Sequence, residues 1–242
     1  MSAAEILYEG KAKIVYKTDD PNILLAHFKD DATAYNAQKK GQIVGKGRMN
    51  CTIAAHLFQM LETAGIATHF ISQTAEDEMQ VRAVKIIPLE VVVRNIAAGS
   101  LCQQTGLELG TVLKKPLVDF HYKNDALGDP LLTHARILLM EVVSETQLNQ
   151  LIERALQINQ ILADFFEKCQ ITLVDFKLEF GCDVNQVLLL ADEISPDTCR
   201  LWQKGESDPS RRVMDKDRFR RDLGDIENAY AQVMERVLAQ SA

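Results

Sequence analysis

Several signatures of common protein classes are missing from this 242-residue chain. Its five cysteines form no CxxC pair, and its five histidines show neither HxxxH nor HExxH spacing, so no zinc motif is expected. The odd cysteine count argues for reduced thiols and a cytoplasmic protein. No apolar run approaches the roughly 18 residues of a membrane span, and the first residues lack the basic and apolar regions of a signal peptide. We expect no membrane partner.

Positive charge is also in short supply, because the net charge is −7. An acidic chain has no general surface for nucleic acid, so we expect no nucleic-acid partner, and any phosphate ligand must meet a local cluster of bases. The Walker spacing GxxxxGK[ST] is absent, although residues 41–47 are rich in glycine. What remains is ordinary globular composition, with 47% hydrophobic and 25% charged residues, and enough length for one large domain or two lobes.

The first half of the chain reads as β-rich. Residues 6–30 predict a meander with a turn at Asp19–Asn22. Residues 31–47 are polar and punctuated by glycine, which indicates a loop, and residues 50–64 have the apolar stripe of an amphipathic helix. Further strands are expected at 68–72, 80–88 and 89–94.

The second half mixes helices with a hairpin. Ser144 and Gln147 form a capping box ahead of a helix that extends to about Lys168. Residues 173–181 and 187–193 predict two antiparallel strands, and residues 216–239 predict a closing helix. Together these patterns predict an α+β protein whose β-rich lobe joins a larger lobe near residues 85–90. A ligand between two lobes would be the usual arrangement.

The hairpin carries the most suggestive chemistry. Strand alternation places Asp175, Lys177 and Glu179 on one face, and Asp192 closes the second strand. Folding the hairpin would bring Glu179 and Asp192 together, with a lysine between them, which suits a magnesium ion carrying a polyphosphate. Alternation alone equally describes a half-buried strand whose charges face water. Asp192 argues against that alternative, because a carboxylate at the end of an apolar strand is oddly placed for solubility.

Local clusters of bases offer phosphate sites. Gly10 interrupts a strand beside Lys11 and Lys13, which could grip a phosphate or could be two solvated lysines. Arg94 ends a β-branched run and is followed by small residues up to Ser100, a pattern typical of a phosphate-monoester site, although Arg94 could simply pair with an acid. Residues 215–221 place four more bases at the start of the closing helix, where an anion would relieve their conflict with the helix dipole.

Six segments in order resemble one family closely, the phosphoribosylaminoimidazole-succinocarboxamide synthases (SAICAR synthetases) of purine biosynthesis. The carriers are Leu7–Lys13, Pro88–Ser100, Lys123–Asp125, Val174–Gly181, Asp192–Asp197 and Asp215–Phe219. The resemblance implies a two-lobed α+β fold related to ATP-grasp and kinase lobes, with residues 1–87 as the ATP-binding lobe and 88–242 as the substrate lobe. It implies a carbon–nitrogen ligase that joins L-aspartate to CAIR, 5-amino-1-(5-phospho-D-ribosyl)imidazole-4-carboxylate. ATP and Mg²⁺ would be its cofactors.

The resemblance also implies roles for single residues. Catalytic residues would be Asp175 and Lys177, and the magnesium ligands would be Glu179, Asp192 and Asp175. The nucleotide would contact Lys11, Ala12, Lys13, Val84, Ile86, Lys123, Glu179 and Asp192. CAIR would contact Glu90, Arg94, Ser100, Arg200 and Arg218.

Three further expectations accompany the resemblance. The family suggests a homo-oligomer, a dimer in the simplest case. Asn36 stands where some relatives carry an acid, so it is left out of the expected site. Two rival functions use the same nucleotide apparatus, namely a small-molecule kinase and a non-catalytic nucleotide-binding regulator.

Overall fold

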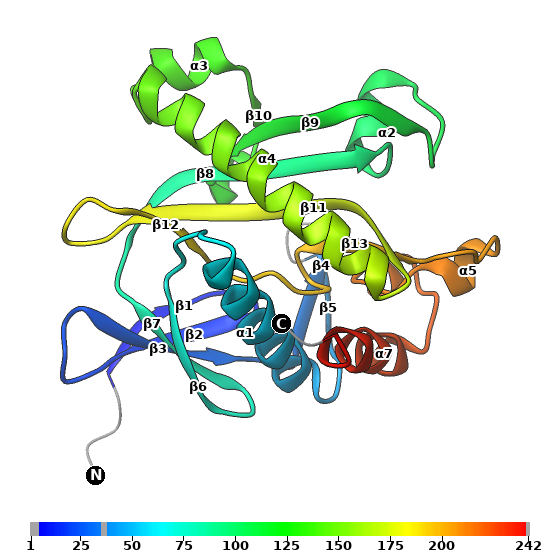
Figure 1. Cartoon of the computed structure of the whole chain (residues 1–242), viewed down its shortest axis with the longest axis horizontal. Coiled ribbons are helices and arrows are strands. Elements are labelled where there is room, and N and C mark those ends of the chain that lie inside the picture. The colour runs from blue at the N-terminus through cyan, green and yellow to red at the C-terminus, as the bar shows by residue number, and fades with distance from the viewer. Residues whose placement is uncertain (1–4, 35–37, 241–242) are drawn as a thin grey trace.

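The computed structural model describes residues 5–34 and 38–240. Its first layer is a five-stranded antiparallel sheet in the order β1-β2-β3-β7-β6 (Figure 1). The meander expected from residues 6–30 is confirmed as its first three strands. The strand bounds are β1 Ile6–Glu9, β2 Lys13–Lys17, β3 Ile23–Phe28, β6 Phe70–Ala75 and β7 Glu78–Arg82.

The expected loop at 31–47 was wrong. Strands β4 (Asp31–Ala34) and β5 (Lys39–Gln42) form a separate hairpin, and helix α1 (Lys46–Thr63) already begins at Lys46. Ala32 and Ala34 alternate toward a small buried cluster that is completed by Phe219, nearly 190 residues away in sequence. Small side chains gave no local strand signal, so the tertiary contact decides the structure. Asn36 lies outside the described residues.

The second layer is a six-stranded antiparallel sheet with β11 at its centre. Its path is β10-β9-β8-β11-β12, and β13 also pairs with β11. The expected hairpin is confirmed as β11 and β12, and the strands expected at 80–94 resolve into β7 and β8. The bounds are β8 Lys85–Ile96, β9 Val112–Tyr122, β10 Leu131–Leu132, β11 Ile171–Cys182, β12 Leu188–Ala191 and β13 Cys199–Gln203.

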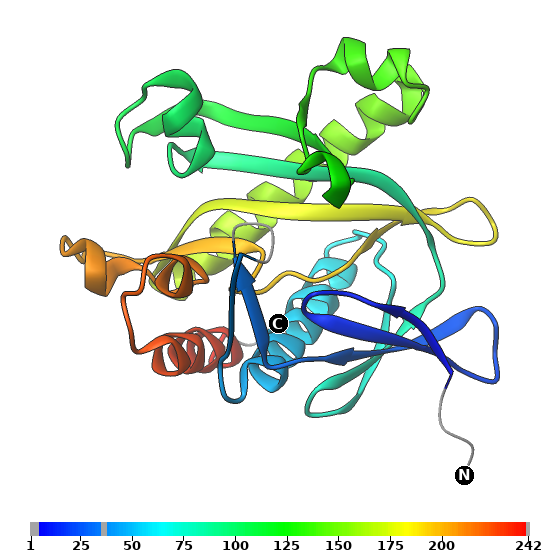
Figure 2. The same ribbon diagram turned by 180° about the vertical axis from the view of Figure 1, so that it is seen from behind.

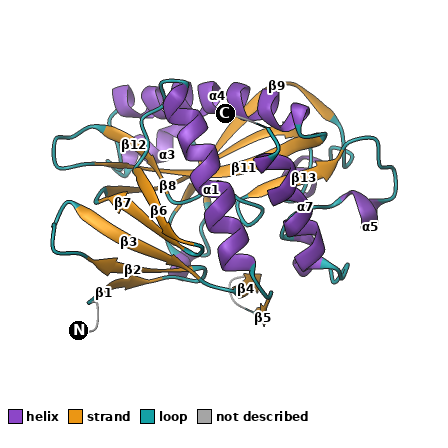
Figure 3. Ribbon diagram, turned by 60° about the horizontal axis from the view of Figure 1, so that its bottom comes forward, coloured by secondary structure: helices purple, strands orange, loops and turns teal. Residues whose placement is uncertain are grey.

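The helices confirm one sequence expectation and correct another. Ser144 and Gln147 form the capping box that starts α4 (Glu145–Lys168). The closing helix is instead two helices, α6 (Asp217–Arg220) and α7 (Ile226–Leu238), the second of which is labelled in Figure 3. Asp222, Gly224 and Asp225 all have positive φ and break the helix between them. The remaining short elements are α2 Ser100–Thr105, η1 Asp125–Leu127, α3 His134–Leu139 and α5 Pro209–Arg212.

One continuous core joins the two layers. It contains Leu57 of α1, Leu162 of α4, and Phe176, Leu178 and Phe180 of β11. Helix α4 crosses one face of the second sheet, and the view from behind shows the opposite face in front of it (Figure 2). From Asp175 to Phe180 the strand alternates strictly, so Phe176, Leu178 and Phe180 enter the core and the charged residues between them lie on the other face. Among the described residues, no helix is both long and apolar enough to cross a membrane.

Candidate active site

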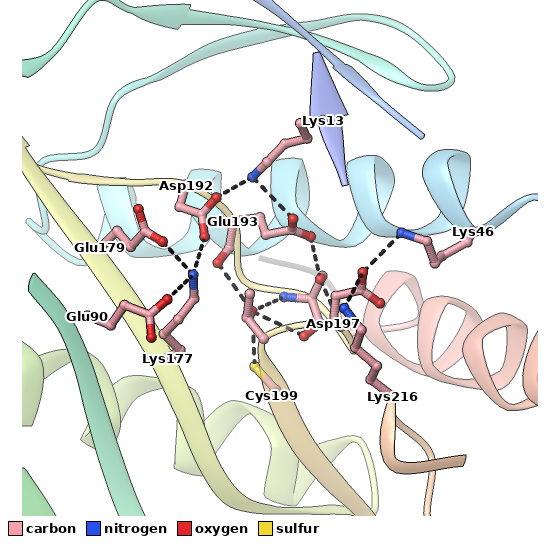
Figure 4. Close-up of polar contacts among 12 residues, drawn as sticks. Lys13, Lys46, Glu90, Lys177, Glu179, Asp192, Glu193, Asp197, Cys199 and Lys216 are labelled. Atoms are coloured by element: carbon pink, nitrogen blue, oxygen red, sulfur yellow. Dashed lines mark hydrogen bonds and ion pairs between the residues drawn. The ribbon is translucent and has the colours of Figure 1, made fainter. Parts of the chain in front are cut away.

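The hairpin brings its acids together around one lysine. Lys177 Nζ lies 2.5 Å from Glu179 Oε1, 3.0 Å from Asp192 Oδ2 and 3.5 Å from Glu90 Oε1 (Figure 4). The register explains this, because Glu179 pairs with Ala191 and Asp192 follows immediately. The expected juxtaposition of Glu179 and Asp192 is thus confirmed as geometry.

Neighbouring charges shift the pKa values of Lys177 and Asp192. Burial lowers the pKa of Lys177, but the carboxylates of Asp192 and Glu179 outweigh it and leave that pKa well above its ordinary value. Burial likewise opposes ionisation of Asp192, yet Lys13 and Lys177 hold its pKa far below the usual range. Asp192 and Lys177 therefore remain charged near neutral pH.

Lysines from outside the hairpin reach the same acids. Lys13 Nζ lies 2.5 Å from Asp192 Oδ1, and Lys123 Nζ lies 2.7 Å from Glu179 Oε1. Lys11 is exposed and pairs with Asp125 at 2.7 Å. Lysines from β2, from the loop after β9 and from β11 thus meet over the hairpin.

The other expected nucleotide contacts are backbone positions near the lobe junction. Ala12 lies in the loop before β2, where its carbonyl accepts a hydrogen bond from the Lys29 N–H at 2.8 Å. Val84 stands just before β8, and Ile86 pairs with Gly181 of β11. A Cβ on Gly181 would lie 2.9 Å from Val84 Cβ, so this junction is packed without space for a side chain.

A second polar group lies farther along the same face of β11. A cavity of about 230 Å³ is lined by Glu90, Arg94, Ser100, Asp175, Lys177 and Arg200, together with Val92, His121, Phe176, Asp197, Thr198, Cys199 and Arg220. Asp175 Oδ2 lies 2.7 Å from Arg200 Nη1 and 3.4 Å from Arg94 Nη1. Arg94 also donates to the Ser100 hydroxyl at 3.2 Å. The anticipated anion site is a real hollow with two guanidiniums in its wall.

Arg218 is not part of that hollow. Its guanidinium donates to the carbonyls of Ser210, Val213, Leu223 and Gly224, at 2.7 to 3.3 Å. Its expected place is taken by Arg220, which lines the cavity and donates to Asp217 Oδ1 at 2.6 Å. Because α6 has only four residues, helical periodicity could not tell which arginine faces the ligand.

Asp175 belongs with the arginines more than with the acid pair. Four residues of extended strand separate it from Glu179, which is roughly 13 Å at 3.3 Å per residue. Both guanidiniums bond its Oδ2 atom. One ion could not contact Asp175 together with Glu179, so Asp175 could bind magnesium only through a second ion, and a position beside the reacting carboxylate is compatible with the geometry.

Comparison with known proteins identifies the family. The SAICAR synthetase family model matches residues 6–237. A phosphoribosylaminoimidazole-succinocarboxamide synthase of Acaryochloris marina is 72% identical over 240 residues, covering 99% of this chain and 98% of that protein. The chain belongs to the SAICAR synthetase family.

Solved structures agree with this assignment. The synthase from Ehrlichia chaffeensis is 42% identical, with a TM-score of 0.93 over 98% of this chain and 100% of that one. A SAICAR synthetase solved in complex with ADP is 43% identical, with a TM-score of 0.91 over 97% of this chain and 98% of that one. The α+β fold expected from the sequence is therefore confirmed.

A buried cluster beside the cavity was missed by sequence reasoning. Asp197 accepts bonds from Lys46 Nζ at 3.0 Å and from the Tyr230 hydroxyl at 2.8 Å, and Lys216 Nζ lies 3.6 Å away (Figure 4). Burial opposes the charge of Asp197, but Lys216 and Lys46 hold its pKa well below its ordinary value. Asp197 lies within a family motif, yet no spacing in the sequence connects it to α1 or α7.

The residues near Lys177 have the right chemistry for magnesium. Within the described ranges, no three His, Cys, Asp or Glu side chains are yet close enough to form a metal cluster. Lysine ammonium groups occupy the space between Glu90, Glu179 and Asp192. Hard carboxylate oxygens that are supplemented by phosphate oxygens are what Mg²⁺ binds in phosphoryl-transfer sites, so the donor set fits this ion.

A larger hollow lies elsewhere and has a simpler explanation. It measures about 390 Å³ and is lined by Lys168 and Arg236, near the C-terminal ends of α4 and α7, and by Lys204, which follows β13. Cations at helix C-termini complement the helix dipole. Lys204 pairs with Glu167, and Arg236 donates to the Gln170 carbonyl. These bases are accounted for by the fold.

Proposed function

We propose that the chain uses ATP to join L-aspartate to the carboxylate of CAIR, forming SAICAR, ADP and phosphate. The family assignment supports this, as does the relative that was solved with ADP. The observation that carries the proposal is the division of one face of β11. Lys177 and Glu179 face an acid and lysine group at one end, and Asp175 faces an arginine-lined cavity at the other.

The nucleotide would occupy the end near the first sheet. Lys11, the Ala12 backbone, Lys13 and Lys123 would contact its phosphates, and the junction at Val84 and Ile86 would hold the adenine. Glu179 and Asp192 would hold Mg²⁺ against the phosphates. When bound, the ion would neutralise charge on the transferring phosphoryl group.

CAIR would occupy the arginine-lined cavity. Arg94, Ser100 and Arg200 would bind its ribose phosphate, and Arg220 joins them in place of Arg218. Guanidinium groups suit this task because they bind phosphate through paired N–H donors. The imidazole carboxylate would then point along β11 toward Lys177, with Glu90 beside it.

The reaction would proceed through an acyl phosphate. An oxygen of the CAIR carboxylate attacks the γ-phosphorus of ATP, and the bond to the β-phosphate oxygen breaks to release ADP. The aspartate amine then attacks the acyl carbon, loses a proton and expels phosphate. Lys177 would neutralise charge along this path, and Asp175 would face the reacting carboxylate. Burial raises the pKa of Asp175 in spite of Arg200 and Arg94, which makes it a better proton acceptor than an ordinary carboxylate.

The proposal extends to the domain organisation, the cellular location and the assembly of the protein. Residues 1–87 and 88–242 would act as two lobes on either side of the nucleotide. All five cysteines are free thiols, as a cytoplasmic enzyme requires. A homodimer is the proposed assembly.

One incubation separates the ligase from its rivals. The protein is mixed with ATP, Mg²⁺ and CAIR, with or without aspartate, and ADP and products are measured. The ligase requires aspartate for SAICAR and for sustained ADP release. A small-molecule kinase would give stable product and ADP without aspartate, and a regulator would bind ATP without turnover under either condition.

A further inference from the structure

Asp192 and Glu193 are adjacent acids that share one lysine. Lys13 Nζ lies 2.5 Å from Asp192 Oδ1 and 3.1 Å from Glu193 Oε1 (Figure 4). The Asp192 side chain is 18% exposed and also contacts Lys177, whereas that of Glu193 is only 3% exposed. One acid is therefore partly exposed and the other is almost fully buried.

A hydroxyl fixes the enclosed acid. Ser195 Oγ donates to Glu193 Oε2 at 2.5 Å and accepts from the Asp197 N–H at 3.1 Å. Ser195 is itself buried, with 1% of its surface exposed. Each oxygen of Glu193 thus has its own partner, Lys13 for one and Ser195 for the other. Glu193 is held by a buried hydroxyl, whereas among the described residues the more exposed Asp192 is bonded only to the side chains of Lys13 and Lys177.

We propose that Glu193 is the positioning residue for Lys13. The inference rests on the proposed nucleotide role of Lys13 and metal role of Asp192. When Asp192 turns toward Mg²⁺ and nucleotide, its hold on the Lys13 ammonium weakens. Glu193 cannot follow, because Ser195 holds it, so it keeps the ammonium aimed at the phosphates.

Lys13 needs such a partner. A lysine side chain has four flexible bonds and a compact charge, and unlike arginine it has no rigid donor plane to keep its direction. The Phe28 ring, 5.2 Å from Lys13 Nζ, supports the ammonium from one side. Glu193 would supply the fixed countercharge that the ring lacks.

The test is a double-mutant cycle on ADP binding at saturating Mg²⁺, the condition in which Asp192 would turn toward the ion, together with a magnesium titration of ADP binding. Glu193→Gln keeps the shape and an acceptor for Ser195 but removes the charge. By calorimetry we expect Glu193→Gln to weaken ADP binding about tenfold and Lys13→Met to weaken it further. The double variant should bind ADP as well as Lys13→Met alone does. Glu153→Gln is the matched control, because Glu153 is exposed on α4 and the charge change is the same. It should bind ADP like the wild type.

Three results would overturn the inference. The first is a double variant whose loss of ADP affinity equals the sum of the two single losses. The second is a Glu153→Gln variant that loses as much ADP affinity as Glu193→Gln. The third is a Glu193→Gln variant that binds ADP normally but needs more magnesium, as expected for a metal ligand. If Glu193→Gln fails to fold, judged by circular dichroism, Ser195→Ala replaces it and should weaken ADP binding about threefold in a Lys13-dependent way. SAICAR formation is assayed separately, so loss of the proposed ligase reaction would leave this binding result standing.

Discussion

Asp192 ends its strand in an unusual backbone state. Its φ of 63° lies in the left-handed region, which costs a non-glycine residue about 1–3 kcal/mol. The turn aims its carboxylate at two lysines, Lys13 and Lys177. The fold thus accepts local strain to place one carboxylate where bases from two sheets meet, which is the kind of position that function explains better than stability.

Asp192→Asn should keep the fold and reduce turnover about 100-fold or more, on the scale of losing one major electrostatic contact in an active site. The amide preserves the shape but cannot supply a charged oxygen to Mg²⁺. The measurement is kcat for SAICAR formation at saturating ATP and magnesium, with circular dichroism as the folding control. Turnover near that of the wild type would contradict the metal role.

Substitution of the two arginines of α6 should have different effects, on substrate binding for Arg220 and on stability for Arg218. Arg220 lines the cavity, so Arg220→Ala should raise the KM for CAIR tenfold or more, since a charged hydrogen bond contributes about 1.5–3 kcal/mol, while the KM for ATP stays constant. Arg218→Ala removes the donor to four carbonyls, that of the buried Val213 among them, and should lower the free energy of unfolding by about 1–3 kcal/mol. Steady-state kinetics and urea denaturation measure the two effects. The reverse pattern would restore Arg218 to the substrate site.

For single residues, sequence reasoning succeeded where side chains alternate strictly along a strand. Asp175, Lys177 and Glu179 share a face because a strand alternates strictly, and the hairpin register then brings Asp192 to them. It could not separate Arg218 from Arg220, which lines the cavity, because a four-residue helix has too few turns to set a face. It also failed at Asp197, whose partners are far away in the chain.

Strand β11 is the element on which both ends of the site depend. Gly181 lies where it passes the lobe junction, and an added Cβ would meet Val84 Cβ at 2.9 Å and the Lys85 carbonyl at 3.0 Å. A change here moves the segment proposed to hold adenine without touching any charged group. The glycine thus connects strand packing with nucleotide binding.

Gly181→Ala should therefore raise the KM for ATP severalfold and leave that for CAIR almost unchanged. Overpacking of this kind costs about 1–3 kcal/mol. Adding Val84→Ala should recover part of the ATP affinity, because it removes the side-chain atoms nearest the new methyl group. Steady-state kinetics on both variants provide the measurement. Equal losses for ATP and CAIR would instead indicate a general distortion of β11.

The elements themselves were predictable where their signals were local. The capping box at Ser144 and the meander of the first sheet were both correct. The β4–β5 hairpin was missed because its apolar face is made of alanines that pack on Phe219. The break before α7 was missed because Asp222 and Asp225 adopt positive φ with little warning in the sequence.

At the scale of the whole molecule, Asp197 links segments that lie far apart in the sequence. Its carboxylate joins Lys46 of α1, Lys216 ahead of α6 and Tyr230 of α7, so it ties α1 to the last helix of the chain. The side chains of Asp197 and Lys46 are 3% and 1% exposed. Removing one member of such a buried pair leaves an uncompensated charge, which is far more costly than losing a surface ion pair.

Asp197→Asn should lower the free energy of unfolding by about 3–5 kcal/mol at neutral pH. Because folding lowers the pKa of Asp197, its contribution is complete above the unfolded value of about 3.9 and is lost as the pH falls through the lower folded value. The difference in the free energy of unfolding between wild type and Asp197→Asn should therefore shrink as the pH falls below about 4. Urea denaturation across pH 3–7 measures it, with Tyr230→Phe as a control that keeps both lysine pairs and loses only about 1 kcal/mol. A difference that persists unchanged into acid would show that the stabilisation does not come from the Asp197 charge.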